Sequence, residues 1–223
     1  MVELTIEEAK ILNPDLAPAL FLPSPADVLD AIEKGLVKEW LGFIADEHVA
    51  QKKKLLLLVP CAAKKPYEPP RNELYKRLLE LETRFKDLYL CAVSEPLALE
   101  PREYWNFKWK GMNLIYDAPF FPWIARYGYK WDIEVAKEVW NKLAEVASKW
   151  FDRNKYRFEK VVAFACPDSG YREILRLVQV DRYVPEECPD IEVSYKENVS
   201  RVYTQLRVWT ELEEVVMRVM KKG

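Results

Sequence analysis

Four short apolar stretches of the chain are each followed by a polar loop that contains proline, which we call a corner. The first corner carries the most reactive groups. Cys61, Lys65 and Tyr67 stand together in the loop that begins at Pro60. An ammonium group in such a loop can neutralise an anion or, when partly desolvated, act as a base or an amine nucleophile. A nucleophilic cysteine needs a partner that forms the thiolate, and only lysines are at hand. We therefore expect Cys61 to close the strand and not to attack a substrate.

The other three corners each carry a carboxylate. Glu95 follows Ser94, Asp117 stands two residues before Pro119, and Asp168 follows Pro167. Ligands of open α/β sheets bind outside the carboxyl ends of parallel strands, so we expect these carboxylates to converge with Lys65 on one crevice. There they could hold an amine, hydrogen-bond the amino edge of a purine or supply a general base. The competing interpretation is that each one caps a helix or pairs with a loop cation.

Residues 100–131 interleave aromatic and basic side chains. This pattern suits a surface on which bases stack and phosphates bind. It is equally what a long loop packed on its own rings would show. The residues concerned are Tyr104, Trp105, Phe107, Trp109, Phe120, Phe121, Trp123 and Tyr127, with Arg102, Lys108, Lys110 and Arg126 between them.

The elements that must position these groups follow from periodicity and capping signals. The apolar runs predict parallel strands at 54–59, 88–93, 113–116 and 160–165, with weaker strand candidates at 191–195 and 205–209. Helix N-termini are predicted at Thr5, Ser24, Asn72, Asp132, Ser169 and Thr210, and a less regular helix at 36–50. Strands that alternate with helices predict an α/β fold in three α/β/α layers with a mostly parallel central sheet. We expect a helical N-terminal extension, 1–53, packed on an α/β core domain, 54–223.

Composition limits the function classes. The formal net charge is −2, which removes the simplest argument for non-specific binding to nucleic acid. The four cysteines include no C-x-x-C pair, and the sequence has one histidine, so we expect no metal site and no cofactor. No apolar run reaches the length of a membrane span, so we expect no membrane partner and a cytoplasmic protein with reduced thiols.

The first corner resembles a known family. Pro60-Cys61-x3-Lys65-Pro66-Tyr67 is similar to the P-C-x3-K-P-Y-x2-S-x2-H signature of archaeosine synthases. Three later segments also resemble that family, in the same order, and the likeness covers about residues 54–170. These segments are Ser94-Glu95-Pro96-Leu97, Pro101-Arg102-Glu103 and Tyr116-Asp117-x-Pro119.

The resemblance implies an α/β/α domain similar to the uracil-DNA glycosylase fold and a conjugating reaction. In that reaction the amine of free lysine adds to the nitrile of a 7-cyano-7-deazaguanine base in archaeal tRNA. The implied partners are tRNA or the modified nucleobase, free lysine and a separate tRNA-binding subunit, with DNA not favoured. The expected catalytic residues are Lys65, Glu95, Asp117 and Asp168. The expected substrate-binding residues are Cys61, Lys64, Pro66, Tyr67, Ser94, Arg102 and Trp105.

The chain departs from the signature in its second half. The serine of the family falls on Pro70 and its histidine on Glu73. A second hypothesis is therefore a non-catalytic nucleobase-binding or RNA-binding module, or an accessory subunit that has lost the catalytic residues. A third, base excision as in glycosylases, rests on fold analogy alone.

Overall fold

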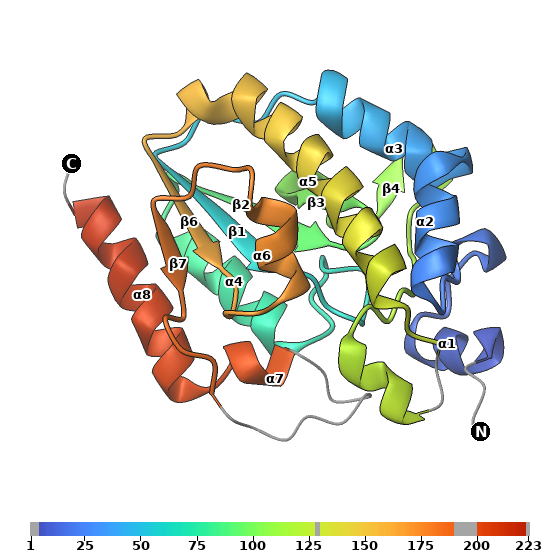
Figure 1. Ribbon diagram of the computed structural model, residues 1–223. Helices are drawn as coiled ribbons and strands as arrows, with labels where there is room; N and C mark the ends of the chain where they lie inside the picture. Colours follow the sequence, from blue (N-terminus) through green and yellow to red (C-terminus); the bar gives the residue numbers. More distant parts are fainter. Residues whose placement is uncertain (1–4, 128–129, 190–199, 222–223) are drawn as a thin grey trace.

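The computed structural model describes residues 5–127, 130–189 and 200–221 and has three α/β/α layers. The central sheet has the strand order β3-β2-β1-β6-β7 (Figure 1). Only β3, at one edge, runs antiparallel to its neighbour. The strands are β1 (Leu55–Pro60), β2 (Leu88–Ser94), β3 (Ala98–Pro101), β6 (Lys160–Phe164) and β7 (Arg182–Val184). The predicted fold class is confirmed.

The middle of the sheet is almost wholly apolar because helices cover both of its faces. Every residue of β1 and β2 is buried, as expected for central strands of a parallel sheet. Helices α5 and α6 pack together over one face, while α4 and α8 lie against the other (Figure 1). The carboxyl ends of β1, β2 and β6 therefore meet at one edge of the sheet.

Capping residues set most of the helix starts that the sequence predicts. Thr5 forms the predicted capping box, and Ser24, Asn72 and Asp132 accept hydrogen bonds from first-turn amides. The helices are α1 (Ile6–Leu12), α2 (Pro25–Glu33), α3 (Gly35–Asp46), α4 (Glu73–Arg84), α5 (Ile133–Asn154), α6 (Gly170–Leu175), α7 (Ser200–Tyr203) and α8 (Leu206–Lys221). Short 3-10 turns lie at Pro18–Leu20, Arg102–Tyr104, Pro122–Tyr127 and Lys155–Arg157.

Two strand predictions are wrong, and a third is not tested. Residues 113–116 were expected as a parallel strand, but Met112–Asn113 forms β5 of a separate hairpin with β4 (Lys108–Trp109). The segment 205–209 is wrong as a strand because α8 begins at Leu206, four residues before the predicted cap at Thr210. The predicted strand at 191–195 lies outside the described residues. The antiparallel β3 and the short β7 were not predicted.

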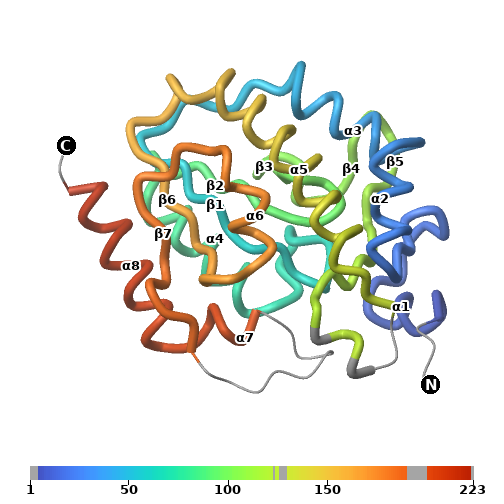
Figure 2. The backbone as a smooth tube through the Cα atoms, in the orientation of Figure 1, coloured from blue at the N-terminus to red at the C-terminus, as the bar shows by residue number. Residues whose placement is uncertain are grey.

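The N-terminal helices join the core directly. Helices α2 and α3 pack against α5, and the indole N–H of Trp40 donates to the carbonyl of Leu97 at 3.0 Å. Figure 2 shows this segment folding back beside the chain that follows β5. A division of the chain at residue 53 stays a prediction. Within the described ranges, no helix is both long and apolar enough to cross a membrane.

Candidate functional site

The loop that follows β1 folds inward and buries Lys65 at the edge of the sheet where the parallel strands end. Lys65 is only 2% exposed, and its ammonium donates to the Ala62 carbonyl at 3.0 Å. The Lys65 Nζ atom lies 3.6 Å from the ring centroid of Tyr116, a cation–π contact in a site without solvent. Asn13 in the N-terminal segment holds the loop, because its side chain accepts from the Lys65 amide and donates to the Ala63 carbonyl, both at 2.8 Å.

Two buried carboxylates near this lysine each keep an oxygen without a hydrogen-bond partner. Glu100 Oε1 accepts from the Ser94 hydroxyl at 2.7 Å and from the Tyr116 hydroxyl at 2.9 Å, but its Oε2 accepts none. Asp117 Oδ2 is likewise buried and unpartnered. Buried polar atoms in native proteins are nearly always satisfied. The described side chains therefore leave two acceptor positions open to water or to a ligand that brings donor groups.

Burial shifts the protonation equilibria of all three groups. Loss of solvation lowers the pKa of Lys65, although the thiol of Cys61 and the carboxyls of Glu100 and Asp117 oppose that shift. The pKa values of Glu100 and Asp117 are raised by burial, and the charge of Lys65 opposes both shifts. In the described residues, Lys65 makes no direct ion pair with either carboxylate. Burial thus makes the charged form of each group costly, and the attraction between opposite charges offsets part of that cost.

Glu95 forms the second part of the site, at the end of β2. Its Oε1 accepts a hydrogen bond from the indole N–H of Trp140 at 2.8 Å. Burial raises the pKa of Glu95 to about 7, and the Trp140 hydrogen bond opposes that rise. Gly170 leaves room for this contact, since a Cβ there would stand 2.5 Å from Glu95 Oε1. A carboxyl group that titrates near neutrality can both give and take a proton.

Cys61 closes β1 beside these groups but is a poor nucleophile. Its sulfur lies 3.4 Å from the hydroxyl of Tyr171. Burial raises the pKa of Cys61 to about 12. Because the thiolate is the reactive form, a thiol with this pKa is inert at neutral pH. The structure therefore favours the strand-closing role expected for Cys61.

Tyr67 and Trp105 form the wall behind the lysine and are fully buried. The ring of Tyr67 stacks on Tyr75 with centroids 3.8 Å apart and meets Phe107 edge-on at 4.8 Å. Trp105 donates its N–H to the backbone carbonyl of Glu100 at 3.0 Å. These rings shape the cluster, and neither Tyr67 nor Trp105 presents a free face on which a base could stack. Among the described residues, the rings of this segment pack mostly against rings of other elements, such as Trp40, Tyr67 and Trp140, so they belong to the core and do not form a stacking surface.

The predicted site residues divide into two groups. The structure brings together seven of them around the corner loop and the end of β2: Cys61, Lys65, Tyr67, Ser94, Glu95, Trp105 and Asp117. The convergence expected of Asp168 does not occur, because its side chain is exposed in the turn before α6, with a φ of +56°. Lys64 is exposed as well, and Pro66 is half-buried.

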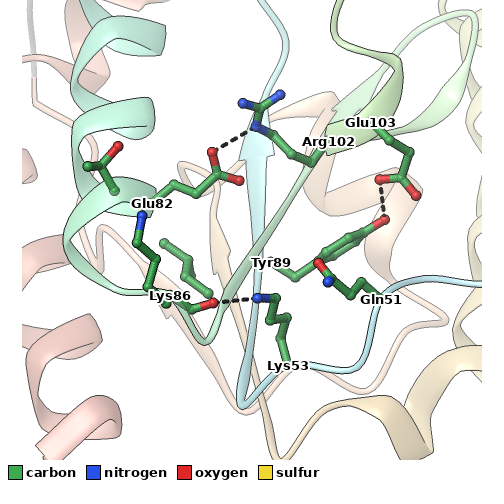
Figure 3. Close-up of a pocket in the computed structure, with 9 residues that line it drawn as sticks. Gln51, Lys53, Glu82, Lys86, Tyr89, Arg102 and Glu103 are labelled. Atoms are coloured by element: carbon green, nitrogen blue, oxygen red, sulfur yellow. Dashed lines mark hydrogen bonds and ion pairs between the residues drawn. The ribbon is translucent and has the colours of Figure 1, made fainter.

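Arg102 lies at the opposite edge of the sheet, in a cavity of about 420 Å³ (Figure 3). There it forms ion pairs with Glu82 at 2.9 Å and with Glu68. Other residues of the lining also bind one another: Lys53 donates to the Lys86 carbonyl, and the Tyr89 hydroxyl donates to Glu103 at 2.8 Å. Arg102 is therefore held by carboxylates of α4 and of the corner loop, which gives it a structural role.

Glu100 is the residue that the sequence pattern did not reveal. It stands in β3, a short antiparallel strand whose four residues are all buried, and it lies at the start of the aromatic segment. Only the structure shows that Glu100 belongs to the site, because the pairing of β3 with β2 places Glu100 opposite Ala92. A carboxylate in an otherwise apolar strand was the one available signal.

The single histidine has a structural role. Trp150 donates its indole N–H to Nδ1 of His48 at 2.8 Å, so the ring proton must lie on Nε2. His48 Nε2 then donates to Glu103, also at 2.8 Å. Within the described residues, no group of three or more His, Cys, Asp or Glu side chains is arranged to hold a metal ion.

Comparison with known proteins gives one informative match. The chain is 29% identical over 153 residues to the archaeosine synthase subunit alpha of Methanosarcina acetivorans. The chain is distantly related to that protein. The match covers 69% of this chain but only 21% of the archaeosine synthase subunit, so the chain spans about a fifth of its relative. No family model matches the chain. No solved structure matches it.

Proposed function

We propose that the chain acts in tRNA modification by binding a 7-deazaguanine base at the buried Lys65 site. The observation that carries this proposal is the pair of unpartnered carboxylate oxygens, Glu100 Oε2 and Asp117 Oδ2, near a buried ammonium. A site rich in acceptors selects a ligand that brings N–H donors, as the amino edge of a deazaguanine does. The distant relationship to archaeosine synthase subunit alpha supports the same substrate class.

The finer proposal is that the chain joins lysine to this base. The amine nitrogen of free lysine attacks the nitrile carbon of the 7-cyano group, and one carbon–nitrogen bond forms. The nitrile becomes an amidine, because one proton leaves the attacking nitrogen and another reaches the former nitrile nitrogen. Glu95 suits the proton transfer because its pKa is about 7. Lys65 would stabilise negative charge that develops on the base. No leaving group and no metal take part.

A specific observation favours the second candidate, a non-catalytic module that binds the base. Glu73 stands where the related signature has histidine, and it pairs with Arg77 at 2.9 Å on the exposed face of α4. Pro70 replaces the serine and is exposed. Neither residue reaches the buried site. Chemistry that depends on that serine and histidine would be lost, while recognition by the buried site would be kept.

The two candidates are separated by one experiment with the full chain. The protein is incubated with free lysine and with tRNA that carries 7-cyano-7-deazaguanine, and digested nucleosides are analysed by mass spectrometry. In parallel, binding of the free 7-cyano-7-deazaguanine base is measured by calorimetry, so that a missing tRNA-binding subunit does not hide recognition. A lysine adduct supports the conjugating enzyme. Binding of the base without an adduct supports the module.

Two variants test whether the base binds at the Lys65 site. Lys65→Met should weaken base binding at least about tenfold, the loss expected when one charged hydrogen bond is removed from a buried site. Lys76→Met, an exposed lysine of α4, is the matched control and should bind as the wild type does. Neither adduct nor base binding in the wild type would refute the proposed function. Equal binding of the base by Lys65→Met and by wild type would show that the base does not bind at the Lys65 site.

A further inference from the structure

Two of the four cysteines come together beyond the carboxyl ends of neighbouring strands. Cys166 follows β6 and Cys188 follows β7, and these strands are paired in parallel with Phe164 opposite Val184 (Figure 1). The pairing continues past β6, because the Ala165 amide donates to the Val184 carbonyl at 2.7 Å. The two segments that carry the thiols therefore leave the sheet side by side.

One arginine fastens the two segments to each other. Arg172 Nε donates to the Ala165 carbonyl at 3.0 Å, and its Nη2 donates to the Pro185 carbonyl at 3.3 Å. The same guanidinium lies over the ring of Tyr183, 4.4 Å from its centroid. Arg172 therefore restrains the chain one residue before Cys166 and three residues before Cys188.

The two thiols are neighbours and differ in access to solvent. Burial and the interaction with Cys188 both raise the pKa of Cys166. Cys166 is 5% exposed, whereas Cys188 is exposed, and both are free. The other two thiols contact oxygen atoms instead: Cys91 the carbonyl of Ala92 and Cys61 the hydroxyl of Tyr171. Cys166 and Cys188 thus combine neighbouring positions with a route for an oxidant.

We propose that Cys166 and Cys188 are an oxidation site, at which hydrogen peroxide converts the two thiols into a disulfide. The exposed Cys188 sulfur attacks one peroxide oxygen, the O–O bond breaks, and sulfenic acid and water result. The Cys166 sulfur then attacks the sulfenic sulfur, the S–O bond breaks, and the hydroxyl group leaves as a second water with the thiol proton. Two thiols are oxidised and one peroxide is reduced. A small dithiol reverses the reaction by exchange.

The disulfide would form next to the candidate site. The Cys166 amide donates to the Tyr203 hydroxyl at 3.0 Å, and Tyr171 contacts the Cys61 sulfur at the end of β1. Oxidation would lock the segment after β7 onto this edge of the sheet. The inference does not depend on the proposed function, because it rests on the thiols and Arg172 alone.

Thiol counting and peptide mapping test this inference. The full chain is treated with hydrogen peroxide, blocked with an alkylating reagent and digested without reduction. We expect two thiols to disappear and a peptide that joins Cys166 to Cys188, two hydrogen atoms lighter than its parts. Dithiothreitol should restore both thiols. Disulfide-linked dimers on a non-reducing gel, or sulfinic acid on Cys188 without a cross-link, would overturn the proposal.

Variants keep the test specific. Cys166→Ser should form no internal cross-link and should leave Cys188 to oxidise further, while Cys188→Ser should keep all three remaining thiols. Cys61→Ser is the matched control and should still lose two thiols, because its sulfur lies outside the pair. An equal loss of thiols in Cys188→Ser and in wild type would show that the oxidation happens elsewhere.

Discussion

Glu95→Gln should stabilise the protein at alkaline pH and leave it unchanged at acidic pH. The carboxyl is 4% exposed and is bonded to Trp140, and burial raises its pKa from 4.5 to about 7. Glutamine keeps the size of the side chain and an oxygen that accepts from Trp140, but it cannot ionise. The variant therefore removes the ionisation of Glu95 and little else.

The size of the effect follows from the two pKa values. Because the folded-state pKa exceeds the unfolded one, the stability that the protonated carboxyl contributes is complete below pH 4.5. It is lost as the pH rises through about 7. At about 1.4 kcal/mol per pKa unit, a rise from 4.5 to about 7 corresponds to about 3 kcal/mol. Glu95→Gln should therefore exceed wild type by up to about 3 kcal/mol above pH 7.

Denaturant unfolding followed by circular dichroism between about pH 4 and pH 9 measures the difference directly. The isosteric control is Asp168→Asn, whose exposed side chain should change the free energy of unfolding by less than about 0.5 kcal/mol. A difference between Glu95→Gln and wild type that stays constant across this range would refute the reasoning. It would mean that Glu95 ionises without cost in the folded protein and is unsuited to proton transfer near neutrality.

Two further predictions concern packing and hydrogen bonds around the core. Gly170→Ala should lower the free energy of unfolding by about 1–3 kcal/mol, since the new methyl would stand 2.5 Å from Glu95 Oε1. Gly42→Ala, a helical position with open space around its Cβ, should instead gain up to about 1 kcal/mol, and equal effects in denaturant unfolding would contradict the prediction. Trp150→Phe should cost about 1–3 kcal/mol because it leaves Nδ1 of His48 buried without a donor, and a change below about 0.5 kcal/mol in thermal unfolding would disprove that role.

The sequence predicted the parts of the fold that depend on local signals. Strong apolar runs located β1, β2 and β6, and side-chain caps located the starts of α2, α4 and α5. The runs at 113–116 and 205–209 were too short for periodicity to decide between strand, loop and helix. Tertiary packing decided them, and Leu206 instead begins the amphipathic helix α8. Short edge strands such as β3 carry too few residues for any pattern to show.

The site was predictable only where a corner follows a buried strand directly. Lys65 and Glu95 met that condition, and both are buried at the same edge. Asp168 met it too, but its turn leaves the side chain in solvent. Glu100 did not, because an antiparallel strand brings it back into the site from the other direction. A residue that directly follows a buried strand is predicted to lie at the carboxyl edge of the sheet. Whether its side chain is buried there depends on how the following loop folds.

The N-terminal segment takes part in building the site as well as covering the core. Asn13 binds both the amide of Lys65 and the carbonyl of Ala63, which fixes the corner loop in its inward course. A few residues later the backbone of Leu20 and Leu22 pairs with Asp117, which holds that carboxylate in place beyond the end of β5. The buried ammonium and one of its two carboxylates are therefore both positioned by residues before 54. A fragment that begins at β1 would keep the sheet residues and lose the geometry that we assign to ligand binding.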